Sequence, residues 1–447
     1  MGSSAILRRS RSAVIFRSLC DYNSTATFRS LNSWCGRESA ANRVMSTMSG
    51  VSSSESRSPS ISPPWLMLPP SLEGGDKIYK FFRPTESGVM SFTERSHGGE
   101  SPDDDARLVG CSHGWVALFN RRNNDLFISN PITRRHIKLP PIHTLPDPEL
   151  NLDLDGHGSV SKVILSSSPD DEECRGMMSF GPSNRLAFCL PGRSSGWTPI
   201  GHLFEDSDHH YPFIRCARVY EDLVYCSRRK VFTSITSGDL NLSSLYFLDR
   251  ERYFPERHDW DIEDPACAGI VRSEQLEFHE NGKGTLTWLE ENIEVLEDEC
   301  IQIPHLVYAE HSDQLFLALR FVQLMNPDGH SPLGYIPYCG FKGLSDVFPG
   351  KTFGFIVIEI DEEGKCTVVD DLNGLAMFVG VNNSFAIPAF KPNSIYFTDA
   401  NRIRMISGAN DTGIFDYQLK TISPCYHAPT TSTPHASPVW FTSNCFT

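Results

Sequence analysis

The sequence predicts an all-β protein, and within that class a kelch-like β-propeller of about six to seven blades. After residue 64, apolar runs of four to eight residues, rich in Val, Ile, Phe, Tyr and Thr, alternate with Asn, Asp, Gly, Pro and Ser. Such short runs between turn formers are typical of strands, and convincing helical periodicity is scarce. Roughly 380 residues of such strand-and-turn units are too many for a single β-sandwich. A propeller of six or seven blades fits this length, because each blade needs about 40–50 residues.

The strand runs recur at blade-sized intervals along the chain. We expect one blade over 108–140, one over 160–200 and one over 214–248. The remaining blades are expected within 300–360 and 365–420. The repeats are loose in sequence, as is usual when each unit only has to bury strands against its neighbours.

Residues 251–300 interrupt the series of strand runs. They contain 15 acidic and 4 basic side chains. Within them, "LTWLEENIEVLEDEC" (286–300) favours one short helix. Because so many like charges cannot be buried unpaired, we expect an exposed acidic insertion between blades.

The N-terminus differs in composition from the body. Residues 1–60 hold eight arginines, no lysine and three acids, and they are rich in serine. This composition predicts a disordered organellar transit peptide over 1–49 and a Ser/Pro linker over 50–63. The propeller domain is then expected over 64–443. Dense arginine within the first 17 residues favours the mitochondrion over the plastid, and a disordered basic tail is the alternative interpretation of the segment.

Charge and hydropathy limit the classes of partner. The net charge is −15, and since residues 1–60 contribute +5 (eight arginines minus three acids), the remainder carries −20. An acidic body argues against nucleic-acid binding and against docking on anionic membranes. No run of about 18 apolar residues exists, so no membrane span is expected. The 13 cysteines include no C-x-x-C pair, which indicates reduced cysteines inside strands.

The stretch "CLPGRSSGWTP" (189–199) contains the pattern G-x-S-x-G, which marks the nucleophile of some hydrolases and here would mark Ser194. A nucleophile elbow needs a strand, a tight turn and then a helix whose amides help to hold an oxyanion. The following "WTPI" favours a strand, because Pro199 disfavours the α region at the residue before it. We therefore interpret Ser194 as a turn residue and expect no catalytic residue.

One stretch imitates a calcium loop. In "NLDLDGHGSVSK" (151–162), Asn151, Asp153, Asp155 and Gly156 fall at ligand or turn positions of such a loop. The last position, however, is Lys162, a cation where a bidentate glutamate is needed. A flexible polar loop is the preferred interpretation.

The cluster "EDSDHH" (205–210) is the other candidate for a metal. In an extended strand, His209 and His210 would point to opposite faces and would not share an ion. The acidic runs 103–105 and 170–173 are interpreted as solvated turns, and no phosphate-binding glycine loop or H-E-x-x-H motif occurs. No metal and no cofactor are expected.

Four tryptophans could either anchor a partner or fill space between blades: Trp115, Trp197, Trp288 and Trp440. Exposed tryptophans are common interface anchors. An aromatic ring at a repeated strand position packs between adjacent sheets, and we favour this role.

An ordered series of motifs resembles a known plant family. The motifs are "CSHGWVALFN" with "LFISNPITRRHIKLPP" (111–141), "KVILSSSP" (162–169), "RLAFCLPG" with "WTPI" (185–200), "YEDLVYCSRRKVFTSITSGDL" (220–240), "NSIYFTD" with "DTGIFDYQL" (393–419) and "PVWFT" (438–442). Over roughly 64–443 the chain resembles the KIB-type β-propeller family, catalogued as domain of unknown function 295. The resemblance implies a propeller with a non-catalytic role and supplies no catalytic residues.

Many members of that family carry an N-terminal F-box, a helical segment that hands targets to a ubiquitin ligase. This chain has an Arg/Ser-rich N-terminus with no Leu-Pro-start helical box, and so resembles the organelle-directed branch. We therefore expect a non-catalytic organellar propeller that binds protein partners as a scaffold or regulator. The alternatives are an F-box-like substrate adaptor, which needs an adaptor-binding helix before residue 64, and a propeller hydrolase, which needs acidic and histidine side chains converging on one pocket.

Overall fold

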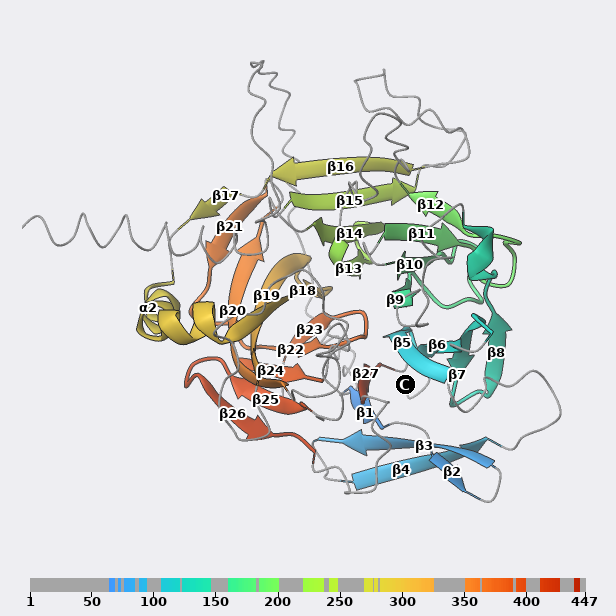
Figure 1. Ribbon diagram of the computed structural model, residues 1–447, viewed down its shortest axis with the longest axis horizontal. Helices are drawn as coiled ribbons and strands as arrows, with labels where there is room; N and C mark the ends of the chain where they lie inside the picture. Colours follow the sequence, from blue (N-terminus) through green and yellow to red (C-terminus); the bar gives the residue numbers. More distant parts are fainter. Residues whose placement is uncertain are drawn as a thin grey trace, which may run out of the picture.

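The described strands form six blades around a central axis in a computed structural model of the chain (Figure 1). The structure describes residues 64–68, 71–73, 76–84, 88–94, 106–120, 123–145, 160–181, 185–200, 220–236, 241–247, 269–275, 277–279, 282–324, 350–361, 364–388, 391–398, 411–426 and 438–442. The predicted transit peptide and linker (1–63) lie outside these residues. The predicted β-propeller is confirmed.

Blades two, three and four are four-stranded antiparallel sheets with their strands in chain order. Blade two comprises β5 (Ala106–Ser112), β6 (Trp115–Asn120), β7 (Leu126–Asn130) and β8 (Arg135–Lys138). After the short 3-10 helix η1 (Ile142–Thr144), blade three comprises β9 (Val160–Leu165), β10 (Gly176–Phe180), β11 (Arg185–Cys189) and β12 (Thr198–Ile200). Blade four comprises β13 (Tyr220–Cys226), β14 (Val231–Thr236), β15 (Asn241–Phe247) and β16 (Gly269–Gln275).

Blades five and six share one ten-stranded sheet. Blade five comprises β18 (Cys300–Ala309), β19 (Gln314–Leu324), β20 (Gly350–Ile360) and β21 (Lys365–Val368), with β17 (Glu277–His279) parallel to β21 at its edge. Blade six comprises β22 (Leu375–Val379), β23 (Phe385–Pro388), β24 (Ser394–Phe397), β25 (Gly413–Asp416) and β26 (Thr421–Pro424). The two blades join because β23 pairs with β22 on one side and reaches β18 on the other.

Blade one closes the ring with strands from both ends of the described chain. It comprises β1 (Trp65–Met67), β2 (Ser71–Glu73), β3 (Asp76–Arg83), β4 (Gly88–Glu94) and β27 (Val439–Phe441). Strand β27 pairs antiparallel with β1, which in turn pairs with β3, and β4 forms the outer edge (Figure 1). Closure of this kind joins the two ends of the described chain by main-chain hydrogen bonds within one sheet.

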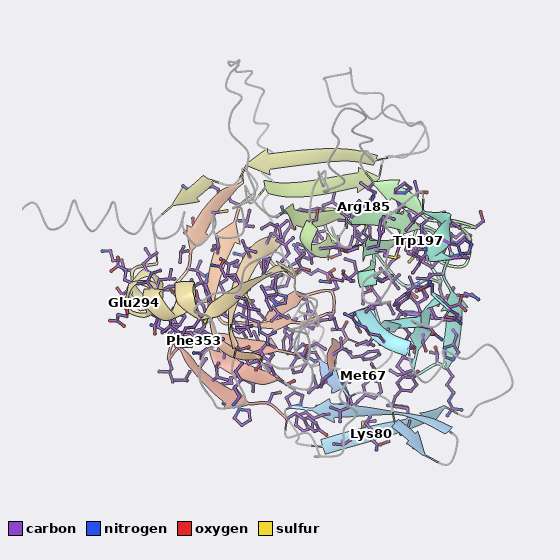
Figure 2. All side chains as sticks on the ribbon, in the orientation of Figure 1. Met67, Lys80, Arg185, Trp197, Glu294 and Phe353 are labelled. Carbon is purple, nitrogen blue, oxygen red and sulfur yellow. The ribbon has the colours of Figure 1, made fainter. Side chains whose placement is uncertain are left out.

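The core lies between neighbouring blades, where side chains from facing sheets interdigitate (Figure 2). One apolar cluster joins blades two and three and includes Trp115, Val163 and Trp197. The inner strands come close at Gly110, where a Cβ atom would lie 1.8 Å from the carbonyl oxygen of Val163. Glycine is therefore required there, since any side chain would push β5 away from β9.

The helix α2 (Lys283–Asp298) covers the flank of blade five. Its buried face includes Leu289 and Leu296, whereas Glu294 lies at the rim of the molecule (Figure 2). The ring of Trp288 lies over β20 so closely that a Cβ atom at Gly354 would be 2.7 Å from it. The amphipathic pattern of the segment therefore produces a helix that packs on a sheet through one face.

The strand positions agree closely with the sequence-based blades 108–140 and 160–200. Within 251–300, where we expected an exposed acidic insertion between blades, the described residues include β16, which completes blade four, and α2, which packs on blade five. The helix expected within 286–300 is present and runs from Lys283 to Asp298. A helix or an edge strand can expose a charged face while it buries the other. In the part of the chain that is described, no helix is long and apolar enough to cross a bilayer.

Candidate functional site

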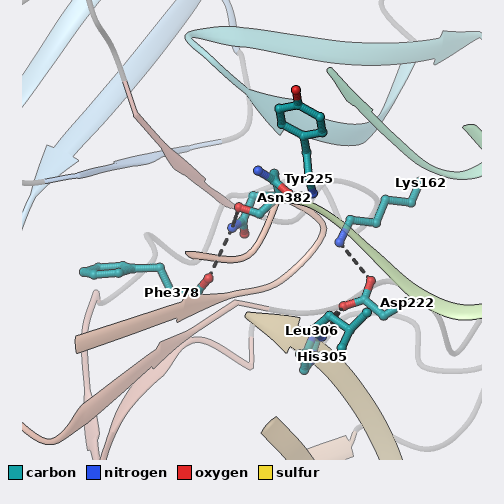
Figure 3. Close-up of polar contacts among 8 residues, drawn as sticks. Lys162, Asp222, Tyr225, His305, Leu306, Phe378 and Asn382 are labelled. Atoms are coloured by element: carbon teal, nitrogen blue, oxygen red, sulfur yellow. Dashed lines mark hydrogen bonds and ion pairs between the residues drawn. The ribbon is translucent and has the colours of Figure 1, made fainter. Parts of the chain in front are cut away.

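A buried polar cluster lies where the inner strands of blades three, four and five meet (Figure 3). Lys162 of β9 donates to the Asp222 carboxylate of β13, with 2.9 Å between Nζ and Oδ1. The second carboxylate oxygen, Oδ2, accepts the amide hydrogen of Leu306 in β18 at 2.8 Å. His305 of β18 places Nδ1 4.0 Å from the same oxygen. One carboxylate therefore holds three blades together.

All three ionisable side chains of this cluster are almost completely removed from solvent. Burying a lone charge costs far more than a protein can recover elsewhere, so a buried ammonium and carboxylate must be paired. The sequence supplies the pair by placing one lysine and one aspartate on innermost strands whose other residues are largely apolar. The geometry is that of a structural ion pair.

The loop between β22 and β23 crosses the same region from blade six. The backbone amide of Asn383 donates to the Cys111 carbonyl of blade two at 2.8 Å, and its side-chain oxygen accepts the Tyr225 amide of blade four at 3.2 Å. The Asn382 side chain donates to the carbonyl of Phe378 at 3.3 Å (Figure 3). Backbone and amide groups of the protein itself thus connect opposite sides of the ring.

Blades four and five are also tied at their hairpin turns. Asp313 accepts hydrogen bonds from the Tyr308 hydroxyl at 2.7 Å and from Arg229 at 2.9 Å. Burial alone would raise the pKa of Asp313, but these hydrogen bonds hold that pKa below its usual value. The carboxylate is therefore charged and fully engaged near neutral pH.

A further polar network, centred on Arg320, joins blades five and six. The buried guanidinium of Arg320 contacts Asp411 at 2.6 Å, the Thr352 hydroxyl at 2.8 Å and the Thr398 carbonyl at 2.7 Å. Its charge also lies 4.8 Å from the centre of the Phe397 ring. A guanidinium suits this position because its planar donors satisfy several acceptors at once.

The structure places Ser194 in the turn between β11 and β12, as expected. Its hydroxyl oxygen accepts the amide hydrogen of Leu190 at 2.9 Å, and its own amide donates to the Leu190 carbonyl at the same distance. The residues that follow form the strand β12 and not a helix. The hydroxyl thus stabilises a turn, and the strand, turn and helix of a nucleophile elbow do not occur here.

Replacing Ser194 with alanine should leave any hydrolytic activity of the purified protein unchanged and cost about 0.5–1.5 kcal/mol of stability, the value of one hydrogen bond. Esterase assays with chromogenic acyl esters, alongside urea unfolding, would measure both quantities. Loss of a measured activity without loss of stability would contradict the turn assignment.

Most of the metal candidates lie outside the part of the chain that the structure describes. Asn151, Asp153, Asp155 and Gly156 lie outside the described residues, as do 103–105 and 205–210, which includes His209 and His210. Lys162, the cation at the end of the calcium-like loop, is in β9 and pairs with Asp222. Among the described residues, no group of three or more His, Cys, Asp or Glu side chains is arranged to hold a metal ion.

The acidic run 170–173 is exposed in a turn of blade three. Asp170 forms an ion pair with Arg135 of blade two at 2.6 Å. Arg193, next to Ser194, donates to the carbonyl of Asp171 at 2.6 Å and also to that of Glu172. The run is therefore a solvated turn, as expected. It also contacts the turn that contains Arg193.

Three of the four tryptophans fill space between blades, as expected, and the fourth packs α2 on blade five. Trp115, Trp197 and Trp440 are buried within core clusters, and the indole nitrogen of Trp197 donates to the Pro140 carbonyl at 2.7 Å. Trp288 is half-buried between α2 and the strands of blade five, with its ring 6.0 Å from that of Phe353. The described cysteines form no disulfide with one another and are mostly buried. Burial raises the pKa of Cys226 to about 11, so its thiol is neutral.

The sequence analysis did not identify the polar contacts between blades, because their partners come from different blades that are far apart in the chain. One feature of the sequence does indicate these contacts. Charged or imidazole side chains stand at or near the start of three apolar runs, namely Lys162 in "KVIL", Asp222 in "EDLVYC" and His305 in "HLVYA". A charge inside an otherwise buried strand requires a partner. The identity of that partner depended on which strands the ring brings together.

Comparison with known proteins decides the family. The family model described as the KIB1-4 beta-propeller matches residues 81–416. The chain belongs to the KIB1-4 β-propeller family. The match runs from β3 to β25, and thus confirms the resemblance inferred from the motifs. No curated protein matches the chain.

Two solved structures have low similarity to this KIB1-4 propeller. A protein from Lactobacillus plantarum is 9% identical, with 84% of this chain and 98% of that chain covered and a TM-score of 0.35. The extracellular domain of a one-component system protein from B. thetaiotaomicron is also 9% identical, with 83% and 53% covered and a TM-score of 0.21. The family match and the strand pairing establish the propeller independently of both.

Proposed function

We propose that this KIB1-4 propeller is a non-catalytic, organellar scaffold that binds a protein partner along the outer seam between blades six and one. The observation that carries the proposal is the position of the exposed large apolar side chains among the described residues. Leu419 and Ile422 are 71% and 43% exposed on blade six, and Val89 and Met90 are 52% and 43% exposed on blade one. Single exposed apolar residues are ordinary, but Ile422 on β26 and Val89 and Met90 on β4 lie on outer strands of adjoining blades, and Leu419 lies in the turn that precedes β26. Such a grouping is typical of a docking surface.

The seam is continuous between the two blades. Phe82 of β3 packs on Tyr426, just after β26, with ring centres 5.2 Å apart. Phe82 is also the register partner of Val89 in β4. Among the described strands, β4 and β26 each pair on one side only, and both carry exposed apolar side chains. A strand edge can accept a partner strand through main-chain hydrogen bonds.

The double replacement of Leu419 and Ile422 by aspartate should reduce recovery of the partner about tenfold or more, since buried apolar anchors contribute most of the binding energy. The measurement is quantitative mass spectrometry of proteins captured by the tagged chain from isolated mitochondria. The matched control replaces Ser195 by aspartate, which adds a charge to an exposed turn on blade three. Equal recovery with the double variant and with this control would place the binding surface elsewhere.

The organellar part of the proposal rests on the Arg/Ser-rich N-terminus and has its own test. Full-length protein carrying a C-terminal tag should be recovered in the mitochondrial fraction with a shortened N-terminus. Tagged protein that remained in the cytosol with residues 1–49 intact would contradict the location and leave the docking surface to be judged by the capture experiment.

A further inference from the structure

The turn that leads from blade five into blade six carries an asparagine followed by a glycine. Asn373 and Gly374 have backbone φ values of 53° and 79°, both in the left-handed region. The Leu375 amide donates to the Leu372 carbonyl at 3.0 Å and closes the turn around the pair. Left-handed φ values at both central positions are typical of a type I′ turn, for which asparagine followed by glycine is a favoured pair.

Both groups through which an asparagine–glycine pair reacts are accessible in this turn. The Asn373 side chain is exposed, and within the part of the chain that the structure describes its amide makes no hydrogen bond. A Cβ atom at Gly374 would meet nothing within 4 Å, so the amide nitrogen of this glycine is not shielded. The hydrogen bond of that nitrogen to the Asn393 side-chain oxygen is long, at 3.4 Å, and therefore weak.

The two residues that precede the turn hold neighbouring elements together. Asp370 accepts the first amides of α2, from Gly284 at 3.1 Å and from Thr285 at 2.7 Å. Asp371 accepts the side-chain amide of Gln418, in the turn between β25 and β26, at 2.8 Å. The start of α2 and the outer part of blade six are therefore tied to the same short segment that carries the asparagine.

We propose that Asn373 is a site of spontaneous deamidation, with isoaspartate as a product, and that this modification loosens the contacts of the turn with α2 and blade six. Water is the co-reactant. The inference is independent of the proposed partner and compartment. It rests on the geometry of the turn, on the exposed side-chain amide and on the open space at Gly374.

The reaction starts at the backbone nitrogen of Gly374. This nitrogen attacks Cγ of Asn373 and forms a C–N bond, while the bond from Cγ to the side-chain nitrogen breaks. The side-chain nitrogen leaves as ammonia, together with the proton lost by the glycine nitrogen, and a cyclic succinimide remains. Water then opens the ring: attack at the side-chain carbonyl yields aspartate, and attack at the main-chain carbonyl yields isoaspartate, in which the chain runs through Cγ. Glycine favours the first step, because no side chain hinders its nitrogen.

Modification would disturb the turn in two ways. The Asp371 carboxylate already accepts the Asn373 amide at 2.5 Å, so a new carboxylate on the same residue adds a repelling like charge beside it. Isoaspartate also lengthens the main chain by a methylene group between the two central residues. The hydrogen bond from Leu375 to Leu372 cannot keep its geometry in the longer turn. We therefore expect the start of β22 and the first turn of α2 to open more often after modification.

The sequence contains a matched control, because its other asparagine–glycine pair is Asn281–Gly282. Gly282 is buried where α2 begins, and a Cβ atom there would lie 2.7 Å from the Val368 carbonyl oxygen. The Gly282 carbonyl also accepts the Leu286 amide of α2 at 2.9 Å. The nitrogen of this glycine can therefore approach an asparagine side chain only after local opening.

Purified full-length protein, kept folded in mildly alkaline buffer, should deamidate at Asn373 about tenfold faster or more than at Asn281, because only the second site needs local opening. In concentrated urea the two sites should react at similar rates, since both are then unfolded asparagine–glycine pairs. Peptide mass spectrometry over time measures both sites in one sample, and chromatography of the modified peptides separates aspartate from isoaspartate. Equal rates in the folded protein, or reaction at Asn373 in urea alone, would overturn the proposal.

The consequence for the junction has a separate readout. The variant Asn373→Gly is the control, because two glycines also form a type I′ turn and cannot form a succinimide. After the same incubation, the wild type should show several-fold faster amide hydrogen exchange than fresh protein at the start of β22 and in the first turn of α2. Incubated Asn373→Gly should match its own fresh sample. An equal increase in both proteins, or unchanged exchange in fully modified wild type, would show that deamidation does not loosen the junction.

Discussion

Replacing Asp222 with alanine is expected to lower the free energy of unfolding by about 3–5 kcal/mol, because the change strands a buried ammonium. Lys162 would lose its carboxylate at 2.9 Å, and the Leu306 amide would lose its acceptor at 2.8 Å. The two partners come from blades on either side of blade four, so both contacts between inner strands would weaken together. Equilibrium unfolding in urea, followed by circular dichroism, measures the loss.

A double replacement tests whether the cost comes from the unpaired charge. Lys162→Met combined with Asp222→Leu removes both charges and keeps apolar bulk, so it should recover most of the stability lost in Asp222→Ala. The single variant Lys162→Met should be less damaging than Asp222→Ala, since the carboxylate would keep the Leu306 amide as a donor. If the double variant were as unstable as Asp222→Ala, the ion pair would not be the source of the effect.

Replacing Trp440 with alanine is expected to cost about 3–5 kcal/mol, the usual range for a large aromatic residue in a core. Trp440 lies in β27 and is 1% exposed. Its ring packs edge-on against Phe378 at 5.1 Å and Tyr396 at 5.6 Å, both in blade six. The replacement therefore weakens the packing between blades one and six, where the ring of blades closes.

Hydrogen exchange can show where the loss occurs. In Trp440→Ala, amides of β1 and β27 should exchange faster than those of blades three and four, because the closing strands would open before the rest of the propeller. The control variant Ile422→Ala removes a 43% exposed side chain and should change stability by about 0.5 kcal/mol or less. Uniformly faster exchange across all blades would argue against a local opening at the junction.

Local features of the sequence were enough to predict much of the fold. Strand runs bounded by turn formers matched blades two and three closely, and the proline after Thr198 identified a strand where a nucleophile elbow needs a helix. These features succeed because each depends on residues that are neighbours in the chain. Strand β16, within the acidic region 251–300, was not expected from the sequence, since it is recognised as a strand through its pairing with β15.

By itself, the sequence determined the all-β class, the repeated strand units, the turn role of Ser194 and the packing role of the tryptophans. Only the tertiary structure decided which polar residues meet. Lys162 and Asp222 are 60 residues apart, and the Leu306 amide lies 84 residues beyond Asp222, yet one carboxylate binds both. Likewise, Trp65 and Phe441 become partners at the closure. The physical reason is that propeller blades are assembled side by side, so contacts between them depend on the closed ring and not on spacing along the chain.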